Sequence, residues 1–255
     1  MTLSAIVAPN GYERFDVGPT VVVARVAAAA GLRRALQGAA SLHAWAEAVP
    51  GAEPFQGRAT AWGVPLPGAA IDVVVRHARR GGLLAGVRGD RFVWPGRAPW
   101  ELETALRLQE AGVRTPDVVA YALYPAGPGL CRCDVATRRL PVGAEFPVSW
   151  RDADASSRET MLIAVGTLLR DLRAAGAQHA DLNAKNLFLA RDGNRWAAWV
   201  LDVDRVRFRA PNDPEVGAQN LARLDRSLRK LRDRRTLELD DAALARLAEL
   251  SGTPG

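Results

Sequence analysis

The chain has 255 residues, of which 48% are hydrophobic and 24% charged. This balance excludes an intrinsically disordered chain, and the length suits one large domain or two joined lobes with a substantial core. The formal net charge is +6 and comes mainly from arginine, since lysine occurs only at Lys185 and Lys230. Such an arginine excess reflects either GC-rich coding or a basic surface for phosphate, nucleic acid or anionic lipid.

Two further classes of protein are disfavoured by the sequence. The longest apolar run, residues 20–31, is interrupted by Arg25, so no membrane-spanning segment is expected, and no signal peptide is visible. Cys131 and Cys133 are expected on opposite faces of a strand, where a disulfide between them would be strained. With no second cysteine pair, a zinc site is not expected either. We therefore expect a protein of the reducing cytoplasm.

The first half of the sequence predicts a β-rich lobe with few helices. An extended lead-in is followed by β-branched residues and an alanine run that favours a helix, and Ser41 is a candidate helix cap. Pro99 and Gly112 bracket the one well-defined amphipathic helix. The expected elements are a strand leading into a helix over 20–37, a short helix over 41–48, two short strands within 55–64, strands over 70–77, 117–124 and 130–136, and the helix over 99–111.

The second half predicts a mainly helical lobe. Apolar residues recur at helical spacing from Met161 to Leu172, and Ser156 or Ser157 is the expected cap of that helix, which Gly176 ends. Residues 187–203 read as a hairpin around Asp192-Gly193-Asn194. Further helices are expected over 215–232 and 240–250.

Chemistry is concentrated in the segment His179-Ala-Asp181-Leu-Asn-Ala-Lys-Asn186. A carboxylate followed five residues later by an amide, both anchored by apolar neighbours, is the arrangement used for phosphoryl transfer from ATP. Asp181 would accept the proton of the attacking hydroxyl, and His179 would brace the loop by hydrogen bonding. The alternative is an ordinary Asp-Leu-Asn turn at the end of a helix.

Asp202 strengthens this interpretation because it follows a predicted apolar strand, where a second magnesium ligand beside Asn186 belongs. The alternative for Asp202 is a turn residue at the end of a strand. The nucleotide loop, Gly57-Arg-Ala-Thr60-Ala-Trp, carries a single glycine, through which backbone N–H groups could approach phosphates. It could equally be a plain hairpin.

The lysine that usually pairs with ATP phosphates is absent, and Arg76 stands at the end of the predicted strand instead. Arginine keeps the charge with a different geometry. Its acidic partner should come from the following helix, as Glu101 or Glu103, although either residue could simply favour the helix dipole. The loop Arg79-Arg80-Gly81-Gly82 could grip an anionic acceptor or be a solvated loop.

Together, residues 179–187, 75–83, 201–205 and 220–231 resemble the corresponding segments of bacterial 3-deoxy-D-manno-octulosonic acid (Kdo) kinases, within the lipopolysaccharide kinase group. The resemblance spans about residues 50–235 and implies an α+β, two-lobed protein-kinase-like fold. The chain departs from the family at Lys185, where His is frequent, at Ala59, which replaces a glycine, and at Val203, which replaces Phe.

The domains expected on this basis are an N-terminal extension over 1–50 that packs on the N-lobe, a β-rich nucleotide-binding N-lobe over 51–136, and a helical C-lobe over 137–255. Carried over to this chain, Asp181 is the catalytic base and Asn186 with Asp202 holds magnesium. Arg76 with Glu101 aligns the phosphates, Glu101 being favoured over Glu103 by its distance from Gly112.

The resemblance further implies ATP and Mg²⁺ as cofactors and phosphorylation of the 4-hydroxyl of Kdo on a lipid A precursor. A basic protein would meet this anionic glycolipid on the cytoplasmic face of the inner membrane as a peripheral protein. Two alternatives stay open: a kinase for another hydroxyl, such as a heptose or an aminoglycoside-like compound, and a non-catalytic pseudokinase scaffold. A nucleic-acid partner is not expected, because no basic platform is interleaved with aromatic residues.

Overall fold

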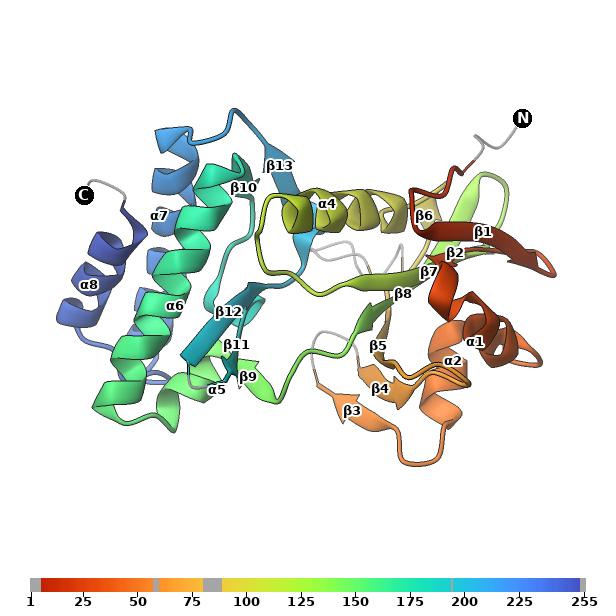
Figure 1. The fold of residues 1–255 in the computed structure, drawn as a ribbon, viewed down its shortest axis with the longest axis horizontal. Helices are drawn as coiled ribbons and strands as arrows, with labels where there is room; N and C mark the ends of the chain where they lie inside the picture. The colour runs from red at the N-terminus through yellow and green to blue at the C-terminus, as the bar shows by residue number, and fades with distance from the viewer. Residues whose placement is uncertain (1–5, 57–59, 80–88, 194, 253–255) are drawn as a thin grey trace. The chain divides into compact units, whose positions relative to one another are not determined.

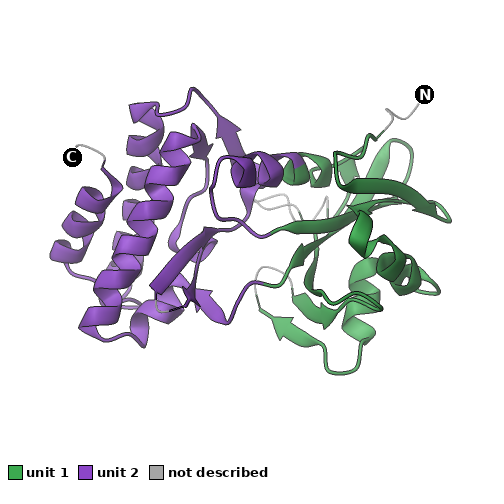
Figure 2. Cartoon of the chain, in the orientation of Figure 1, with its two compact units in different colours: residues 1–102, 117–139 green, residues 103–116, 140–255 purple. Residues whose placement is uncertain are grey.

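A computed structural model describes residues 6–56, 60–79, 89–193 and 195–252 of the chain. The chain divides into two compact units (Figure 2): residues 1–102 with 117–139, and residues 103–116 with 140–255. The helix α4 (Ala98–Glu110) is shared, since its first turn belongs to unit 1 and the remainder to unit 2. The mixed α+β class predicted from the sequence is confirmed.

Unit 1 is built on one antiparallel sheet, shown in Figure 1. Its strand order is β1-β2-β7-β8-β5-β4-β3, and β6 also pairs with β8. The strands are β1 (Tyr12–Val17), β2 (Thr20–Arg25), β3 (Glu53–Phe55), β4 (Ala61–Pro65), β5 (Asp72–His77), β6 (Phe92–Val93), β7 (Val118–Pro125) and β8 (Leu130–Arg138).

One face of this sheet carries the core of unit 1. Alternate residues of the strands, such as Val22, Val73 and Val75, are buried against the helices α1 (Val26–Leu36) and α2 (Leu42–Ala48). As expected, Ser41 caps α2, because its Oγ accepts a hydrogen bond from the Ala44 N–H. The first fifty residues therefore supply strands and helices to the same core as the rest of the unit.

The lead-in contains a strand that the sequence interpretation missed. β1 pairs with β2 through a two-residue turn, Gly18-Pro19, in which Gly18 has φ +56°. Glycine reaches this left-handed conformation without steric cost, so the pair of turn residues signals a tight hairpin rather than an irregular segment.

Unit 2 combines a helical layer with two small sheets. β10 pairs with β13, and β12-β11-β9 form the second sheet. Its elements after α4 are β9 (Gly143–Glu145), α5 (Phe146–Arg151), α6 (Ala155–Ala174), β10 (Ala177–His179), the short 3₁₀ helix η1 (Ala184–Asn186), β11 (Leu187–Asp192), β12 (Arg195–Val200), the 3₁₀ helix η2 (Val203–Arg205), β13 (Val206–Phe208), α7 (Pro214–Asp233) and α8 (Asp241–Ser251).

The expected helices and the hairpin of this half are confirmed, and one cap is corrected. The helix α6 begins at Ala155, earlier than expected, because its cap is Asp154 and not Ser156 or Ser157. The Asp154 carboxylate accepts a hydrogen bond from the Ser157 N–H at 2.7 Å. Gly176 follows the helix with φ +65°, as the predicted stop requires.

The two cysteines lie on the same face of β8, so the expectation of opposite faces was wrong. Residues two apart on a strand point the same way, and both thiols are free, buried and close to Gly96. Burial raises the pKa of the Cys133 thiol to about 12, so the thiol stays neutral. Among the described helices, none is both long enough and apolar enough to cross a bilayer.

Candidate active site

The segment from His179 to Asn186 is held by the imidazole of His179, which is fully buried at the end of β10. Its Nδ1 accepts a hydrogen bond from the Asp181 N–H at 3.2 Å, and its Nε2 lies 3.2 Å from the Leu201 carbonyl oxygen. Nε2 must therefore carry the proton and donate it to that carbonyl. Burial lowers the pKa of His179, so the ring is neutral in this role.

The β11–β12 hairpin brings Asn186 and Asp202 to the same end of one sheet. Leu187 pairs with Val200, and the next backbone contact joins the Leu201 N–H to the Asn186 carbonyl at 2.8 Å. Asp202 follows directly. Since His179 contacts the backbone of both Asp181 and Leu201, it links the loop that carries Asp181 to the segment that carries Asp202.

The loop is also internally braced. The amide Nδ2 atoms of Asn183 and Asn186 both donate to the Asp181 carbonyl oxygen, at 3.1 and 2.9 Å. Asn183 Oδ1 accepts from the Lys185 N–H and so caps η1. These contacts use the backbone of Asp181 and leave its side chain out. In the part of the chain that the structure describes, no hydrogen bond engages the Asn186 Oδ1 atom.

Two carboxylates at this site are exposed and uncommitted. Within the described residues, no hydrogen bond or ion pair engages the carboxylate of Asp181 or of Asp202. Asp202 has φ +54° and ψ +47°, the left-handed conformation that few residues other than glycine adopt. Backbone strain of this kind is concentrated at functional sites.

The donor set at this end of unit 2 fits magnesium. Mg²⁺ takes hard oxygen ligands and is commonly held by one or two carboxylates together with substrate phosphates. Asp202 supplies a carboxylate and Asn186 an amide oxygen. Among the described residues there is no group of three or more His, Cys, Asp or Glu side chains that could hold a metal by itself. A nucleotide-dependent site needs fewer ligands from the protein.

Residues 179–186 form the candidate catalytic loop, called the catalytic loop below. The helix α7 supports it through residues whose role the sequence interpretation missed. The fully buried amide of Asn220 accepts from the His179 N–H at 3.0 Å and donates to the Ala177 carbonyl at 2.9 Å. Two turns later, Ser227 Oγ accepts from the Ala184 N–H at 3.1 Å. The sequence did contain a signal for this role. Asn220 lies on the same helical face as the apolar residues Val216 and Leu224, and an amide buried on such a face needs a specific hydrogen-bond partner.

The remaining site residues predicted from the sequence lie in unit 1. Arg76 Nη2 donates to Glu101 Oε1, and the Glu101 side chain is 8% exposed whereas Glu103 lies on the exposed side of α4. The Thr60 carbonyl accepts from the His43 ring at 2.9 Å, while Gly57 lies outside the described residues. The basic loop 79–82 is described only at Arg79, which is exposed.

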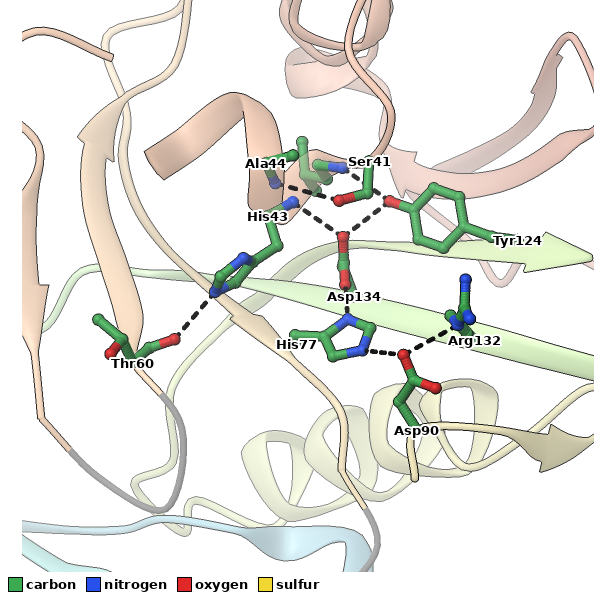
Figure 3. A network of polar contacts seen from close by, with 10 residues as sticks. Ser41, His43, Ala44, Thr60, His77, Asp90, Tyr124, Arg132 and Asp134 are labelled. Carbon is green, nitrogen blue, oxygen red and sulfur yellow. Dashed lines mark hydrogen bonds and ion pairs between the residues drawn. The ribbon is translucent and has the colours of Figure 1, made fainter. Parts of the chain in front are cut away.

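A second polar cluster lies next to Arg76 in the sequence (Figure 3). His77 Nδ1 lies 2.6 Å from Asp134 Oδ1, and His77 Nε2 lies 2.9 Å from Asp90 Oδ2. Both ring nitrogens therefore face carboxylates and both act as donors when the ring is protonated. The hydrogen bond to Asp134 is the main cause that raises the pKa of His77.

Asp134 is the buried centre of this cluster, with no exposed surface. Besides His77, its carboxylate accepts from the His43 N–H at 2.8 Å and from the Tyr124 hydroxyl at 2.9 Å. That hydroxyl in turn accepts from the Leu42 N–H. One buried carboxylate therefore joins β5, β7 and β8 to the first turn of α2 (Figure 3). It fixes the strand end from which Arg76 projects.

Comparison with known proteins agrees with this geometry. The model of the lipopolysaccharide kinase (Kdo/WaaP) family matches residues 42–249. The chain belongs to the lipopolysaccharide kinase (Kdo/WaaP) family. Membership makes it a phosphotransferase that acts on a hydroxyl group and uses ATP, which confirms the kinase interpretation of the sequence.

Curated relatives support the same assignment. The chain is 32% identical over 188 residues to the 3-deoxy-D-manno-octulosonic acid kinase of Xylella fastidiosa (strain 9a5c), covering 71% of each chain. It is 34% identical over 196 residues to the enzyme of that name from Xanthomonas campestris pv. campestris (strain B100), covering 75% of this chain and 74% of the relative.

A solved structure shares the fold. WaaP in complex with acyl carrier protein superimposes with a TM-score of 0.52 at 19% sequence identity, over 82% of each chain. The kinase-like fold predicted for this family member is confirmed, and the alternatives of a different acceptor class or a pseudokinase scaffold are not favoured.

Proposed function

We propose that this family member transfers the γ-phosphoryl group of ATP to the 4-hydroxyl of Kdo on a lipid A precursor. The main support is the arrangement in unit 2, in which His179 links the Asp181 loop to the Asp202 segment while both carboxylates are left uncommitted. An ordinary turn gains nothing from two exposed carboxylates that have no partner among the described residues and lie beside a strained backbone. A phosphoryl-transfer site needs both of them.

In the proposed reaction, the Asp181 carboxylate accepts the proton of the acceptor hydroxyl. The oxygen then forms a bond to the γ-phosphorus, and the bond between that phosphorus and the oxygen bridging it to ADP breaks. ADP leaves with the electron pair of the broken bond. The braced loop serves this step by holding Asp181 in place before the hydroxyl arrives, which lowers the cost of orienting the two groups.

Asn186 and Asp202 are the proposed ligands of Mg²⁺, which would neutralise charge on the nucleotide phosphates. Arg76, fixed by the nearly buried Glu101, would hold phosphate oxygens with its forked guanidinium. Thr60, which directly precedes β4, would contribute to phosphate binding, and Gly57 is proposed for the same role from the sequence alone. His179 positions the loop and, as a buried neutral ring, does not itself exchange protons with the acceptor.

The acceptor is proposed from the names of the relatives, which are kinases of 3-deoxy-D-manno-octulosonic acid. An acceptor of this kind is an anionic glycolipid, and the chain carries a net charge of +6. We therefore propose peripheral attachment to the cytoplasmic face of the inner membrane, by attraction between basic side chains and anionic lipid.

Product analysis with several acceptors tests the proposal. Purified protein is incubated with Mg²⁺ and γ-labelled ATP, together with Kdo-lipid A precursor, heptose-bearing core oligosaccharide or an aminoglycoside. The expected result is one phosphate on the Kdo residue, located at the 4-position by NMR, and no transfer to the other two acceptors. Transfer to heptose or to the aminoglycoside alone would overturn the proposed acceptor.

A further inference from the structure

Two cations on α7, Arg226 and Lys230, are followed by a third, Arg234, at the C-cap of the helix. Arg226, Lys230 and Arg234 are four residues apart and exposed. In the part of the chain that the structure describes, no hydrogen bond or ion pair engages their side chains. They line a surface hollow of ≈ 620 Å³. We call these three residues the α7 cation row.

The acids near this row are already occupied. Asp225 accepts from Arg229 at 2.8 Å, and Asp233 lies 3.6 Å from Arg232. The cations of the row are therefore left uncompensated. Like charges four residues apart on a helix destabilise it by a few tenths of a kcal/mol for each pair. The helix dipole favours cations at the C-terminal end of α7, where Lys230 and Arg234 lie, and so offsets this cost. Since no acidic partner among the described residues engages the row, its charges can bind a ligand outside the chain.

The row begins at the catalytic loop. Ser227, which follows Arg226, accepts the hydrogen bond of the Ala184 N–H, and Ala184 lies between Asp181 and Asn186. Lys230 is three residues beyond Ser227, so the two are neighbours on the helix surface. From Arg226 to Arg234 the row extends about 12 Å at the rise of an α-helix. It therefore leads from the catalytic loop along the outside of unit 2.

We propose that the α7 cation row binds phosphate and carboxylate groups of the anionic acceptor lipid and so positions its hydroxyl at the catalytic loop. The inference rests on the proposed function, since it assigns the acceptor-binding residues of that site. Guanidinium and ammonium groups are the usual partners of these anions. A general membrane anchor would have no reason to begin at the catalytic loop, so we assign the row to the acceptor.

The test compares a double variant, Lys230→Ala with Arg234→Ala, against a control that removes equal charge elsewhere on unit 2. The control is Arg151→Ala with Arg195→Ala, which are also exposed. Each protein is sedimented with phosphatidylcholine vesicles that contain Kdo-lipid A precursor, the same charge as phosphatidylglycerol, or no anionic lipid. Phosphoryl transfer is measured in parallel over a range of acceptor and ATP concentrations.

We expect the α7 variant to bind acceptor vesicles about 25-fold more weakly than the wild type, since each of the two cations removed contributes roughly fivefold. The KM for the acceptor should rise similarly, with kcat and the KM for ATP unchanged. The control should match the wild type. An α7 variant that binds like the control would overturn the inference. So would an equal loss on phosphatidylglycerol vesicles, which would identify a general membrane anchor.

Failure of the proposed function would give results different from failure of this inference. If the wild type transfers no phosphate to Kdo, the acceptor assignment fails under any variant. The vesicle measurements still decide whether the row binds this anionic lipid, because they require no turnover.

Discussion

Removing the Asn220 amide should uncouple α7 from the catalytic loop and destabilise unit 2. Asn220→Ala leaves the His179 N–H and the Ala177 carbonyl without partners, and both residues are fully buried. A buried polar group left without a partner costs about 1–3 kcal/mol. For two such groups we expect a loss of about 3 kcal/mol in the free energy of unfolding, which a domain of ordinary stability tolerates.

The assay is urea unfolding followed by tryptophan fluorescence, combined with the rate of phosphoryl transfer. Ser227→Ala is the matched control, since it removes one hydrogen bond, to the Ala184 N–H, and should cost about 1 kcal/mol. Transfer by the Asn220 variant should fall even under conditions where the protein is fully folded, because the His179 backbone is no longer held. A loss below about 0.5 kcal/mol, within the range of ordinary surface changes, would refute the reasoning.

Three further predictions concern the pH response, the nucleotide site and a close backbone contact. The hydrogen bond to Asp134 raises the pKa of His77 above the ordinary histidine value of 6.5. The stabilisation that this hydrogen bond gives the folded state is therefore complete below about pH 6.5 and is lost as pH rises through the folded pKa of His77. The difference in urea midpoint between wild type and His77→Asn should therefore be largest at acidic pH and shrink as pH rises; a difference that grows with pH would contradict this. Glu101→Gln removes the charge that fixes its arginine partner, so the KM for ATP should rise roughly tenfold while the KM for the acceptor stays constant, and an unchanged KM for ATP would count against the pair. Gly176→Ala places a Cβ 2.4 Å from a backbone oxygen at φ +65° and should cost about 2–4 kcal/mol in thermal or urea unfolding. The matched control, Gly193→Ala, shares a positive φ but meets nothing within 4 Å, so it should cost only about 1 kcal/mol, and equal losses would rule out the steric explanation.

The sequence was informative at many positions where the signal is local, although the tight turn between β1 and β2 was missed. The spacing of His179, Asp181 and Asn186 lies within one loop, and Asp202 follows a strand whose apolar pattern is visible. Contacts between neighbours in the chain also determine three other features: the hairpin between Asn186 and Asp202, the end of α6 at Gly176, and the helix cap at Ser41. Such features follow from backbone geometry and short-range hydrogen bonds, which a single sequence encodes directly.

Two features that the sequence interpretation missed depend on contacts between distant residues. Asn220 is 41 positions from His179, and Asp134 is 57 positions from His77. The local sequence pattern around His179 and His77 does not predict which residue each of them contacts. The α6 cap was assigned to a serine within the helix because residues 152–157 offer several possible caps, and only the observed hydrogen bond selects Asp154.

In the proposed reaction, Asp181 is the group that accepts the proton of the acceptor hydroxyl. Single-turnover transfer from labelled ATP to Kdo-lipid A precursor, measured for wild type and Asp181→Asn, tests this claim most directly. The variant replaces an exposed carboxylate that has no partner among the described residues, so its unfolding midpoint should match the wild type. We predict a rate lower by about 100-fold to 10,000-fold, the usual contribution of a general base. An unchanged rate in a folded variant would contradict the assignment.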